Sequence, residues 1–433
     1  MQRIYSVEMP THVGERVVLA GWLHRLRRLS SVTFLILRDG RGLSQIVVTS
    51  PADVEALAAL APESVLRISG EVVAAPQAPR GCELAAQQIE VVEPALEPPP
   101  FELHRPQIPA QLPTMLDHAA ISLRHPRQRA LWRVAAASVE GFRRTLRAEG
   151  FTEVLTPKLV AGATEGGADV FHVDYFGRDA YLAQSPQLYK QILVGAFERV
   201  FEIGPVFRAE PHDTPRHLNQ YTSLDAEMGF IDDHHTVMGV VERAIAGMLL
   251  ALSETAAEEI ALLKLVLPAS VTPFPSIHFA EAQALIASAT GECLQGELDL
   301  SPAHERWLGE WALTTYGSDF LFVRGFPLAK RPFYTHPDPE RPEFSNSFDL
   351  LFRGLELVTG GQRLHRYADY LISLEARGMS TEGLEGYLEA FKHGMPPHGG
   401  FALGLERWTA RLAGVANVRE TTLFPRDLHR LTP

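Results

Sequence analysis

A proline-rich segment divides this chain into two parts with different patterning. The segment begins at Glu93 and contains Pro94, Pro98, Pro99, Pro100, Pro106, Pro109 and Pro113. Proline fixes one backbone dihedral and donates no hydrogen bond, so a segment of this kind is stiff and extended. We therefore predict a linker at 93–125, an N-terminal domain at 1–92 and a larger C-terminal domain at 126–433.

The N-terminal part has the pattern of a small β-barrel. Short β-rich runs recur at Val17–Arg25, Val32–Asp39, Leu43–Thr49, Val65–Val73 and Ile89–Val92. One helix is predicted at Pro51–Ala61, because proline suits the first helical position. Strands in this order, with a helix after the third, are typical of a Greek-key barrel of the OB type.

The larger part mixes helices with closely spaced strands. A long helix is predicted at Arg127–Glu149, and Gly150 ends it. Further strands are predicted at Ala180–Ala183, Val200–Val206, Ser223–Phe230, Phe320–Phe326, Phe348–Leu351 and Leu355–Val358. Further helices are predicted at Pro186–Phe197, His234–Ala251 and Leu403–Ala413. Because adjacent strands are near enough to pair antiparallel, we predict an α+β fold whose large domain is built on an antiparallel sheet.

The composition is that of a globular protein. Of the 433 residues, 46% are hydrophobic and 21% are charged, so a core can form. No run reaches the roughly 18 apolar residues of a membrane span, and the first residues lack the apolar stretch of a secretory signal. Two cysteines, Cys82 and Cys293, are too few for a disulfide framework, which favours a cytoplasmic protein without membrane contact. The net charge of −12 argues against wrapping in nucleic acid, although the stretch 16–41 is locally basic.

A predicted hairpin carries charged groups at both ends of its loop. Phe207-Arg208-Ala209-Glu210 follows one strand, and the loop 211–218 holds His212, Asp213, Arg216 and His217. Charged groups placed in this way can clamp a polyanion such as a triphosphate. The alternative is an ordinary solvated hairpin loop.

Two acidic residues, Asp349 and Glu356, lie near the ends of apolar strands. A carboxylate on a buried strand is costly unless it is paired or binds a metal, and oxygen ligands suit Mg²⁺. The alternative for either residue is a salt bridge to Arg353 or Arg363.

A glycine-rich segment at 397–404 leads into the last predicted helix. Its glycines permit close approach of the backbone, and Arg407 stands where it could reach a bound nucleotide. The alternative is a tight turn packed under the sheet.

Taken in order, three short segments, the first of which follows the long predicted helix, resemble the signature motifs of class II aminoacyl-tRNA synthetases. Thr156-Pro157 resembles motif 1, Phe207-Arg208-Ala209-Glu210 resembles motif 2, and Gly404-Leu405-Glu406-Arg407 resembles motif 3. The N-terminal barrel is typical of the aspartyl, asparaginyl and lysyl subgroup. Within that subgroup, four strings resemble those of the archaeal-type aspartyl-tRNA synthetases: Ser185-Pro-Gln-Leu-Tyr-Lys190-Gln, Arg208-Ala209-Glu210, Arg216-His217-Leu218 and Gly360-Gly361-Gln362-Arg363. The resemblance covers essentially the whole chain and implies an OB-type anticodon-binding domain followed by a class II catalytic domain.

The resemblance implies an ATP site, with Arg208 and Arg407 as the catalytic residues. Arg208 would hold the α-phosphate and the reacting carboxylate. Glu210 would accept the adenine amino group, and Tyr221 would stack on adenine. The outer phosphates would lie against Arg216, His217 and Arg407. The remaining residues implied to bind ATP are Leu218, Glu356, Gly404, Leu405 and Glu406.

The resemblance also implies a Mg²⁺ site formed by Asp349, Glu356 and Thr359. Serine is usual in the family at position 359. Threonine keeps the hydroxyl group and adds a methyl group, so we expect a slightly rearranged metal shell.

For the amino acid, the resemblance implies a pocket that binds aspartate. Arg363 would offer a two-pronged contact to the side-chain carboxylate, and Lys190 would add a second positive charge. The ammonium end would be held by Asp225 and Gln187, with Ser185 nearby. Three further residues are implied to contact aspartate: Arg208, Thr359 and Glu165, the last in a loop that can close. The alternative for Lys190 is a surface position on a helix.

In the barrel, the resemblance implies that Arg25, Phe34, Gln45 and Glu83 bind the anticodon, because an aromatic platform with polar edges suits unstacked bases. The alternative for Phe34 is a core position. Subgroup members restricted to aspartate tRNA tend to carry tryptophan where this chain has His24, and lysine in the loop that here contains Pro76 and Gln77. We therefore expect an enzyme that charges both tRNA(Asp) and tRNA(Asn), with a tRNA-dependent amidotransferase as partner. The alternative is that His24 is merely a polar barrel residue and that the enzyme charges tRNA(Asp) alone.

Together these features predict a homodimeric enzyme that forms aspartyl-adenylate from L-aspartate and ATP and transfers the aspartate to tRNA. One rival is an asparaginyl-tRNA synthetase, against which Lys190 and Asp225 argue, because a carboxamide cannot satisfy two cations. A second rival is a non-catalytic OB-type RNA-binding protein derived from a synthetase. A third is an amide-forming paralogue that ignores tRNA. Retention of the motif arginines and carboxylates argues against the second rival, and presence of the barrel argues against the third.

Overall fold

The computed structural model describes residues 2–29, 32–162, 170–268 and 272–432. The chain forms two compact units, 1–129 and 130–433. The boundary falls inside helix α4 (Pro126–Ala148), slightly beyond the predicted start of the larger domain. Residues 93–125 belong to the first unit and contain the short helices α2 (Leu112–Asp117) and α3 (Ala119–Ser122).

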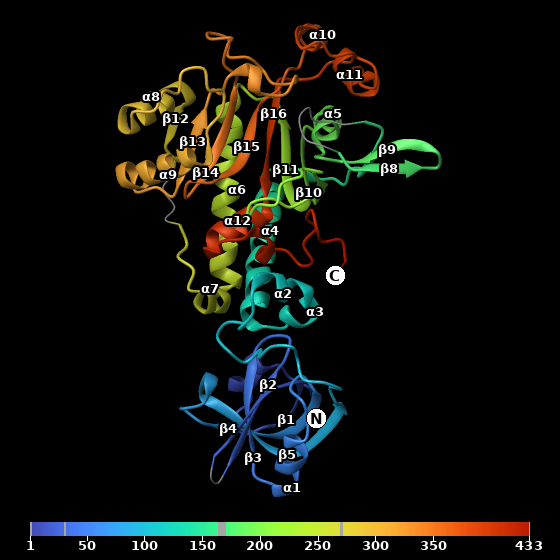
Figure 1. Cartoon of the computed structure of the whole chain (residues 1–433), viewed down its shortest axis with the longest axis vertical. Coiled ribbons are helices and arrows are strands. Elements are labelled where there is room, and N and C mark those ends of the chain that lie inside the picture. Colours follow the sequence, from blue (N-terminus) through green and yellow to red (C-terminus); the bar gives the residue numbers. More distant parts are fainter. Residues whose placement is uncertain (1, 30–31, 163–169, 269–271, 433) are drawn as a thin grey trace. The chain divides into compact units, whose positions relative to one another are not determined.

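The first unit is a closed barrel of strands in the order β1-β2-β3-β5-β4 (Figure 1). The strands are β1 (Arg16–Arg28), β2 (Thr33–Arg38), β3 (Leu43–Val48), β4 (Val65–Ala74) and β5 (Cys82–Glu93), and helix α1 (Pro51–Ala58) follows β3. The barrel prediction is confirmed. The predicted strand at Ile89–Val92 is only the end of β5, because the alanines and glutamines before it hide the β pattern.

The second unit contains an eight-stranded sheet in the order β12-β13-β14-β15-β16-β11-β10-β6. Its strands are β12 (Ser276–His278), β13 (Phe320–Arg324), β14 (Ser347–Phe352), β15 (Glu356–Gln362), β16 (His398–Gly404), β11 (Gln220–Gly229), β10 (Arg199–Phe207) and β6 (Thr152–Glu153). All neighbours pair antiparallel except β12 with β13 and β10 with β6. A separate small sheet joins β7 (Leu159–Val160), β9 (Arg178–Leu182) and β8 (His172–Tyr175). The α+β prediction, with a largely antiparallel sheet, is confirmed.

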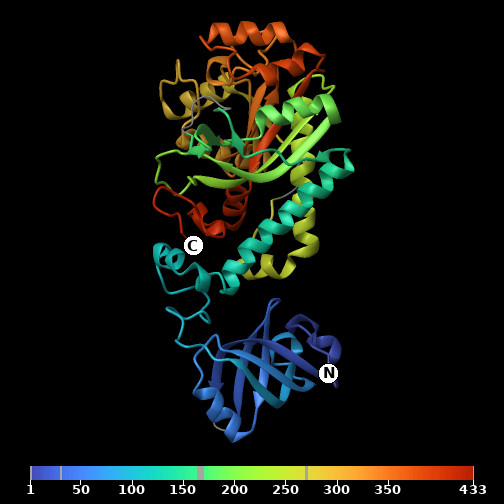
Figure 2. The same ribbon diagram turned by 90° about the vertical axis from the view of Figure 1, so that its right-hand side faces the viewer.

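Two long helices, α4 and α6 (His234–Thr255), pack side by side with the sheet in one hydrophobic core (Figure 2). They cross at Gly141 and Gly247, where a Cβ added to Gly141 would lie 2.4 Å from the Gly247 carbonyl oxygen. Among the described residues, α6 is the one helix long and apolar enough to cross a membrane, with a mean hydropathy of 1.5. Half of that window is buried in the structure, which accounts for its apolar composition as that of a core helix.

The remaining helices surround the sheet. They are α5 (Gln187–Phe197), α7 (Ala257–Leu263), α8 (Phe279–Thr290), α9 (Pro302–Tyr316), α10 (Tyr367–Ala376), α11 (Glu385–Lys392) and α12 (Leu405–Ala413). Helices α2, α3 and α7 to α11 were not among the predicted elements.

The glycine-rich segment before α12 is not a turn under the sheet, as the alternative proposed, but the strand β16, which pairs with β15 and β11. Glycine is required at its centre, because a Cβ added to Gly400 would lie 2.1 Å from the carbonyl oxygen of Ala226. The predicted helix therefore begins at Leu405 rather than Leu403. Sequence patterns miss such a strand because glycine is depleted in most strands.

Candidate active site

A cavity lies where β11, β15 and β16 meet the start of α12. It is lined by Arg208, Glu210, Arg216, His217, Leu218, Tyr221, Ser223, Glu356, Leu357, Thr359, Ala402, Leu403, Gly404, Glu406, Arg407 and Val418. The structure thus brings together all the residues predicted to bind ATP except Leu405, which packs in the hydrophobic core.

The β10–β11 hairpin places a cation and a carboxylate in this cavity. The Arg208 guanidinium lies over the Tyr221 ring, 5.6 Å from its centroid, and Arg208 Nη1 is 3.8 Å from Glu210 Oε1. Asn219 closes the hairpin, because its side-chain amide donates to the carbonyls of Arg208 (2.7 Å) and Glu210 (3.1 Å). Sequence reasoning missed Asn219, although asparagine is a common turn residue.

The loop between β10 and β11 is held by the C-terminal segment. Arg419 Nη2 is 2.6 Å from Asp213 Oδ1, and the Asn219 N–H donates to the Arg426 carbonyl at 2.8 Å. Within the loop, Thr214 Oγ1 and His217 Nδ1 are 2.6 Å apart. These contacts anchor the loop, although residues 211–213 and 215 are exposed to solvent.

Glu406 supports the edge of the hairpin. Its two carboxylate oxygens accept the Thr222 N–H at 2.9 and 3.0 Å. Burial raises the pKa of Glu406 to about 7, and the bond from Thr222 opposes that shift. Beside it, the Arg407 guanidinium lies 3.9 Å from Glu356 Oε1.

The three residues predicted to hold Mg²⁺ lie together on β14 and β15. Asp349 and Thr359 are opposite each other in the register, and the Thr359 hydroxyl donates to Glu356 Oε1 at 3.1 Å. Asp349 Oδ2 accepts from Arg331 at 2.9 Å, whereas Asp349 Oδ1 is buried without a hydrogen-bond partner in the described part of the chain. Burial raises the pKa of Asp349 to about 6, although Arg331 opposes the shift.

These oxygens fit a hard cation. A buried carboxylate oxygen without a partner is costly unless a ligand satisfies it, and carboxylate and hydroxyl oxygens suit Mg²⁺. The alternative partners Arg353 and Arg363 are engaged elsewhere, with Asp319 and Glu227.

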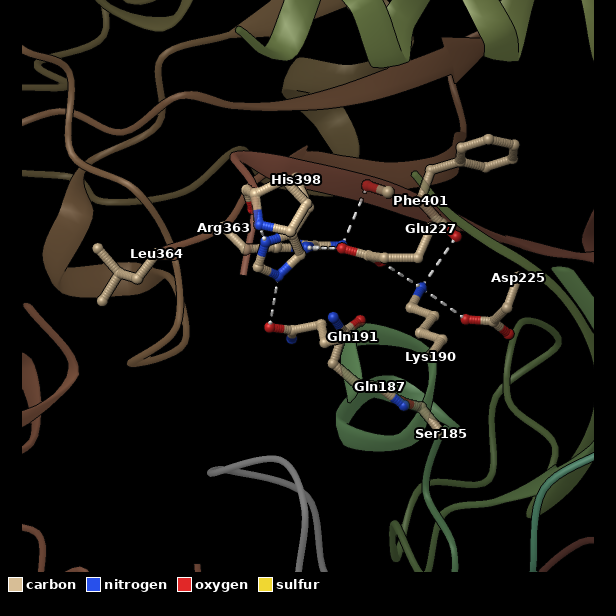
Figure 3. Close-up of polar contacts among 12 residues, drawn as sticks. Ser185, Gln187, Lys190, Gln191, Asp225, Glu227, Arg363, Leu364, His398 and Phe401 are labelled. Carbon is tan, nitrogen blue, oxygen red and sulfur yellow. Dashed lines mark hydrogen bonds and ion pairs between the residues drawn. The ribbon is translucent and has the colours of Figure 1, made fainter. Parts of the chain in front are cut away.

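Lys190, Asp225, Glu227 and Arg363 form a cluster of four buried charges (Figure 3). Lys190 Nζ is 3.0 Å from Asp225 Oδ1 and 3.4 Å from Glu227 Oε2, and it donates to the Phe401 carbonyl at 3.1 Å. Arg363 Nε is 3.0 Å from Glu227 Oε1. Lys190 is only 1% exposed, so the alternative of a surface lysine is wrong. The two cations and two carboxylates sum to zero charge.

Glu227 is the member of this cluster that sequence reasoning did not assign. Alternate residues of a strand share one face, so Asp225 and Glu227 on β11 point the same way. Two acids at this spacing on a buried strand were the available signal. Despite burial, Arg363 and then Lys190 hold the pKa of Glu227 below its usual value.

A neutral polar network backs the charged cluster. Gln191 Oε1 accepts from the hydroxyls of Tyr387 (2.7 Å) and Tyr370 (3.1 Å) and lies 3.3 Å from His398 Nε2. Burial lowers the pKa of His398 to about 4, so its imidazole is neutral near pH 7.

Two further predicted pocket residues begin helix α5. Ser185 Oγ accepts the Gln187 N–H at 3.0 Å, and Gln187 is buried beside the cluster. Ser223 joins the two regions, because it lines the cavity and its hydroxyl donates to Asp225 Oδ2 at 2.5 Å. Glu165 lies outside the described residues.

Comparison with known protein families agrees with the resemblance found in the sequence motifs. A family model of class II tRNA synthetases (D, K and N) matches residues 111–428, and a model of the OB-fold nucleic acid binding domain matches residues 17–92. The chain belongs to the class II tRNA synthetases of this group. The resemblance predicted from the motifs is confirmed.

Individual relatives of this synthetase cover it from end to end. A Thermus thermophilus protein named aspartate–tRNA(Asp/Asn) ligase is 49% identical over 100% of both chains. A Deinococcus radiodurans protein of the same name is 46% identical over 100% of this chain and 99% of the relative. The solved structure of asparaginyl-tRNA synthetase from Pyrococcus horikoshii, complexed with asparaginyl-adenylate, has a TM-score of 0.93 at 32% identity over 99% of each chain.

In the barrel of this synthetase, three of the predicted anticodon residues form a row across neighbouring strands. Arg25 pairs with Ile36, and Ile36 pairs with Gln45. Gln45 Nε2 donates to Glu83 Oε2 at 2.9 Å, which adds β5 to the row.

Phe34 lies on the outer face of the same barrel. The side chains of Leu35 and Leu37 in β2 are buried inside the barrel. Phe34 alternates with them and is half-buried on the opposite face. The core alternative for Phe34 is therefore wrong.

The residues predicted to govern tRNA choice occupy different environments. Pro76 and Gln77 are exposed in the loop after β4. His24 is 7% exposed at an irregularity in the β1–β2 pairing. Burial lowers the pKa of His24 to about 4, with smaller effects from Arg38 and His104.

Proposed function

We propose that this synthetase activates L-aspartate with ATP and Mg²⁺ and transfers the aspartate to both tRNA(Asp) and tRNA(Asn). The observation that carries the amino-acid assignment is the buried pair Lys190 and Arg363, which lies directly beside the nucleotide cavity. The names of the relatives from Thermus and Deinococcus support aspartate and the dual tRNA specificity.

The case against asparagine depends on donors rather than on net charge. Because Asp225 and Glu227 neutralise the two cations, the pocket is not a site of excess positive charge. Lysine and arginine offer hydrogen-bond donors only, and the carboxylates beside them, Asp225 and Glu227, are already held by these two cations. An asparagine amide nitrogen would therefore face donors and compete with the cations for those acceptors. The likeness to the Pyrococcus horikoshii asparaginyl-tRNA synthetase makes that amino acid the rival to test.

In the activation step, the aspartate α-carboxylate attacks the α-phosphorus of ATP in line and pyrophosphate leaves. Arg208 would neutralise charge on the α-phosphate, while Arg216, His217 and Arg407 would hold the outer phosphates. Asp349, Glu356 and Thr359 would hold Mg²⁺, which supplies charge neutralisation for the leaving pyrophosphate. In the second step, the terminal ribose hydroxyl of tRNA attacks the mixed anhydride and AMP leaves.

The proposal includes a cytoplasmic homodimer and, for asparaginyl-tRNA formation, a tRNA-dependent amidotransferase. Aspartate placed on tRNA(Asn) must be amidated before it can be used as asparagine. A synthetase that charges only tRNA(Asp) would need no such partner.

Two assays separate this proposal from its rivals. ATP–pyrophosphate exchange should require aspartate and should not proceed with asparagine, and charging should proceed with both purified tRNAs. If asparagine supported a comparable rate of pyrophosphate exchange, the assignment of aspartate as the substrate would be wrong. Exchange without charging would indicate an amide-forming paralogue, and absence of exchange would indicate a non-catalytic RNA-binding protein.

A further inference from the structure

Glu305 is a buried acid next to the nucleotide cavity that the proposed mechanism does not use. It lies in the first turn of α9 and is 9% exposed. The helix begins at a defined position, because Ser301 caps it by accepting the His304 N–H at 3.3 Å. The Glu305 backbone is therefore held in a regular helical turn.

Two glycines bring α9 into direct contact with the turn between β14 and β15. A Cβ added to Gly309 would lie 2.4 Å from the backbone nitrogen of Gly354. Gly354 has a φ of +70°, and a Cβ there would lie 2.7 Å from Arg306 Cα. Because no side chain separates the two backbones, Glu305 reaches the first residue of β15.

That first residue is Glu356, which lines the cavity and belongs to the magnesium site of the proposed function. Glu305 Oε2 accepts the Glu356 backbone N–H at 3.1 Å. The same oxygen lies 3.9 Å from Arg216 Nη1, and Arg216 also lines the cavity. Glu305 thus contacts a metal-site residue and a phosphate-site residue from behind, without lining the cavity itself.

We propose that Glu305 is a positioning residue for the magnesium and nucleotide site, acting through the Glu356 backbone. The inference rests on the proposed function, because it takes Glu356 as a ligand of Mg²⁺. The bond from Glu356 N–H fixes where β15 starts and therefore where the Glu356 carboxylate and its Thr359 partner lie. Groups that orient a metal ligand typically change metal affinity 10- to 100-fold when they are removed.

The test compares variants that keep or remove the acceptor oxygen. Glu305→Gln retains an oxygen that can accept the Glu356 N–H, whereas Glu305→Met has similar length and no such oxygen. Glu305→Ala is a second variant without the acceptor. Glu310→Gln is the matched control, since Glu310 is exposed on the same helix.

The primary readout is binding of Mn²⁺, as a Mg²⁺ substitute, followed by electron paramagnetic resonance in the presence of a non-hydrolysable ATP analogue. We expect the Mn²⁺ Kd to rise at least tenfold in Glu305→Met and Glu305→Ala and to stay within threefold of wild type in Glu305→Gln and Glu310→Gln. The Mg²⁺ concentration giving half-maximal pyrophosphate exchange should rise in the same two variants. If Glu305 had a purely structural role, its removal would reduce the folded fraction and leave both the Mn²⁺ Kd and the half-maximal Mg²⁺ concentration unchanged.

Several results would overturn the inference. They are unchanged Mn²⁺ affinity in folded Glu305→Met or Glu305→Ala, an equal loss of affinity in Glu305→Gln, and failure of both acceptor-free variants to fold. The Mn²⁺ measurement needs no amino acid, so it separates this inference from the proposed substrate. Wild-type protein that binds Mn²⁺ with the analogue but fails to exchange pyrophosphate with aspartate would sink the proposed function alone.

Discussion

Arg363 and Glu227 form a buried ion pair that crosses strand β16, with 3.0 Å between Arg363 Nε and Glu227 Oε1. The pair passes Gly400, whose carbonyl accepts from Arg363 Nη2 at 3.0 Å. Lys190 approaches the second oxygen of Glu227 at 3.4 Å. Glu227 therefore holds both cations of the proposed amino-acid pocket in place, which would reduce the reorganisation needed when substrate binds.

Replacing Arg363 by alanine should impair both stability and aspartate use. The substitution leaves Glu227 buried with only Lys190 as its cation, so we expect a loss of about 3–5 kcal/mol in the free energy of unfolding. The loss in kcat/KM for aspartate exchange should correspond to about 2–5 kcal/mol. Urea unfolding and pyrophosphate exchange measure the two effects. Lys392→Ala, at an exposed lysine, is the control, and wild-type exchange in Arg363→Ala would contradict the pocket assignment.

Gly400→Ala should destabilise the protein through a steric clash. The added Cβ would lie 2.1 Å from both the Ala226 carbonyl oxygen and Glu227 Oε2, neither of which can move without breaking the sheet or the ion pair. We expect a loss of about 3 kcal/mol or more. Gly386→Ala is the matched control, because Gly386 lies in α11 with open space around it and should gain up to about 1 kcal/mol from helix propensity. Equal melting temperatures of the two variants would refute the clash.

The free energy of unfolding should decrease as the pH is lowered, because His398 titrates differently in the native and unfolded states. Its native pKa of about 4 lies below the ordinary value of 6.5. Between these two pH values, His398 is protonated in the unfolded chain and neutral in the native state. The stability that His398 contributes is fully present above pH 6.5 and is lost as the pH falls towards 4. The loss is about 3 kcal/mol. Urea unfolding between pH 7 and 4.5 should give a shallower pH dependence in His398→Gln than in wild type, and identical slopes would contradict the assignment.

The protein should be a homodimer in solution. Leu155 precedes the Thr156-Pro157 motif and is 85% exposed, which suits an apolar contact with a second copy. Light scattering should give about twice the 47.9 kDa chain mass. Leu155→Asp should weaken the dimer, and Leu96→Asp, at a leucine that is 98% exposed in the first unit, should not. A single species of chain mass at micromolar concentration would refute the prediction.

Local patterns and motif strings found much of this architecture. The 3.6-residue periodicity predicted α4 nearly to its ends, and the string around Arg208 predicted a hairpin whose residues line one cavity. These features depend on neighbours in the sequence. Leu405 is the one predicted ATP-site residue that does not line the cavity, because the start of α12 turns its side chain into the core.

The features that sequence reasoning missed depend on contacts between distant segments. Glu305 reaches Glu356, which is 51 residues further along the chain, only because two glycines let α9 touch the turn between β14 and β15. Strand β16 carries glycines because its partner strands leave no room for a Cβ. A strand-propensity scale assigns such a run of glycines to a turn. Glu227 becomes interpretable only when Arg363 is seen to cross β16 and reach it.

The choice of tRNA should depend on the barrel and not on the catalytic unit. The anticodons of the two tRNAs, GUC and GUU, differ in one base, and a mismatched base is typically worth about 1–3 kcal/mol. This chain has His24 and Gln77 where restricted relatives tend to carry tryptophan and lysine, so we expect weak discrimination. For unmodified transcripts, the kcat/KM ratio of GUC to GUU should stay below about 100, equivalent to roughly 2.7 kcal/mol. A larger ratio would refute the dual specificity.

Introducing tryptophan at position 24 and lysine at position 77 should create a preference for the GUC anticodon. Gln77 is exposed, so Gln77→Lys can place its charge toward RNA without repacking, whereas His24 is buried and His24→Trp must displace its neighbours. We therefore expect Gln77→Lys alone to raise the kcat/KM ratio modestly and the double variant to raise it further. Gln88→Lys, which adds the same charge at an exposed position of β5, should leave the ratio unchanged. Pyrophosphate exchange should be unaffected in all three variants, because every substituted residue lies in the first unit and the activation site lies in the second.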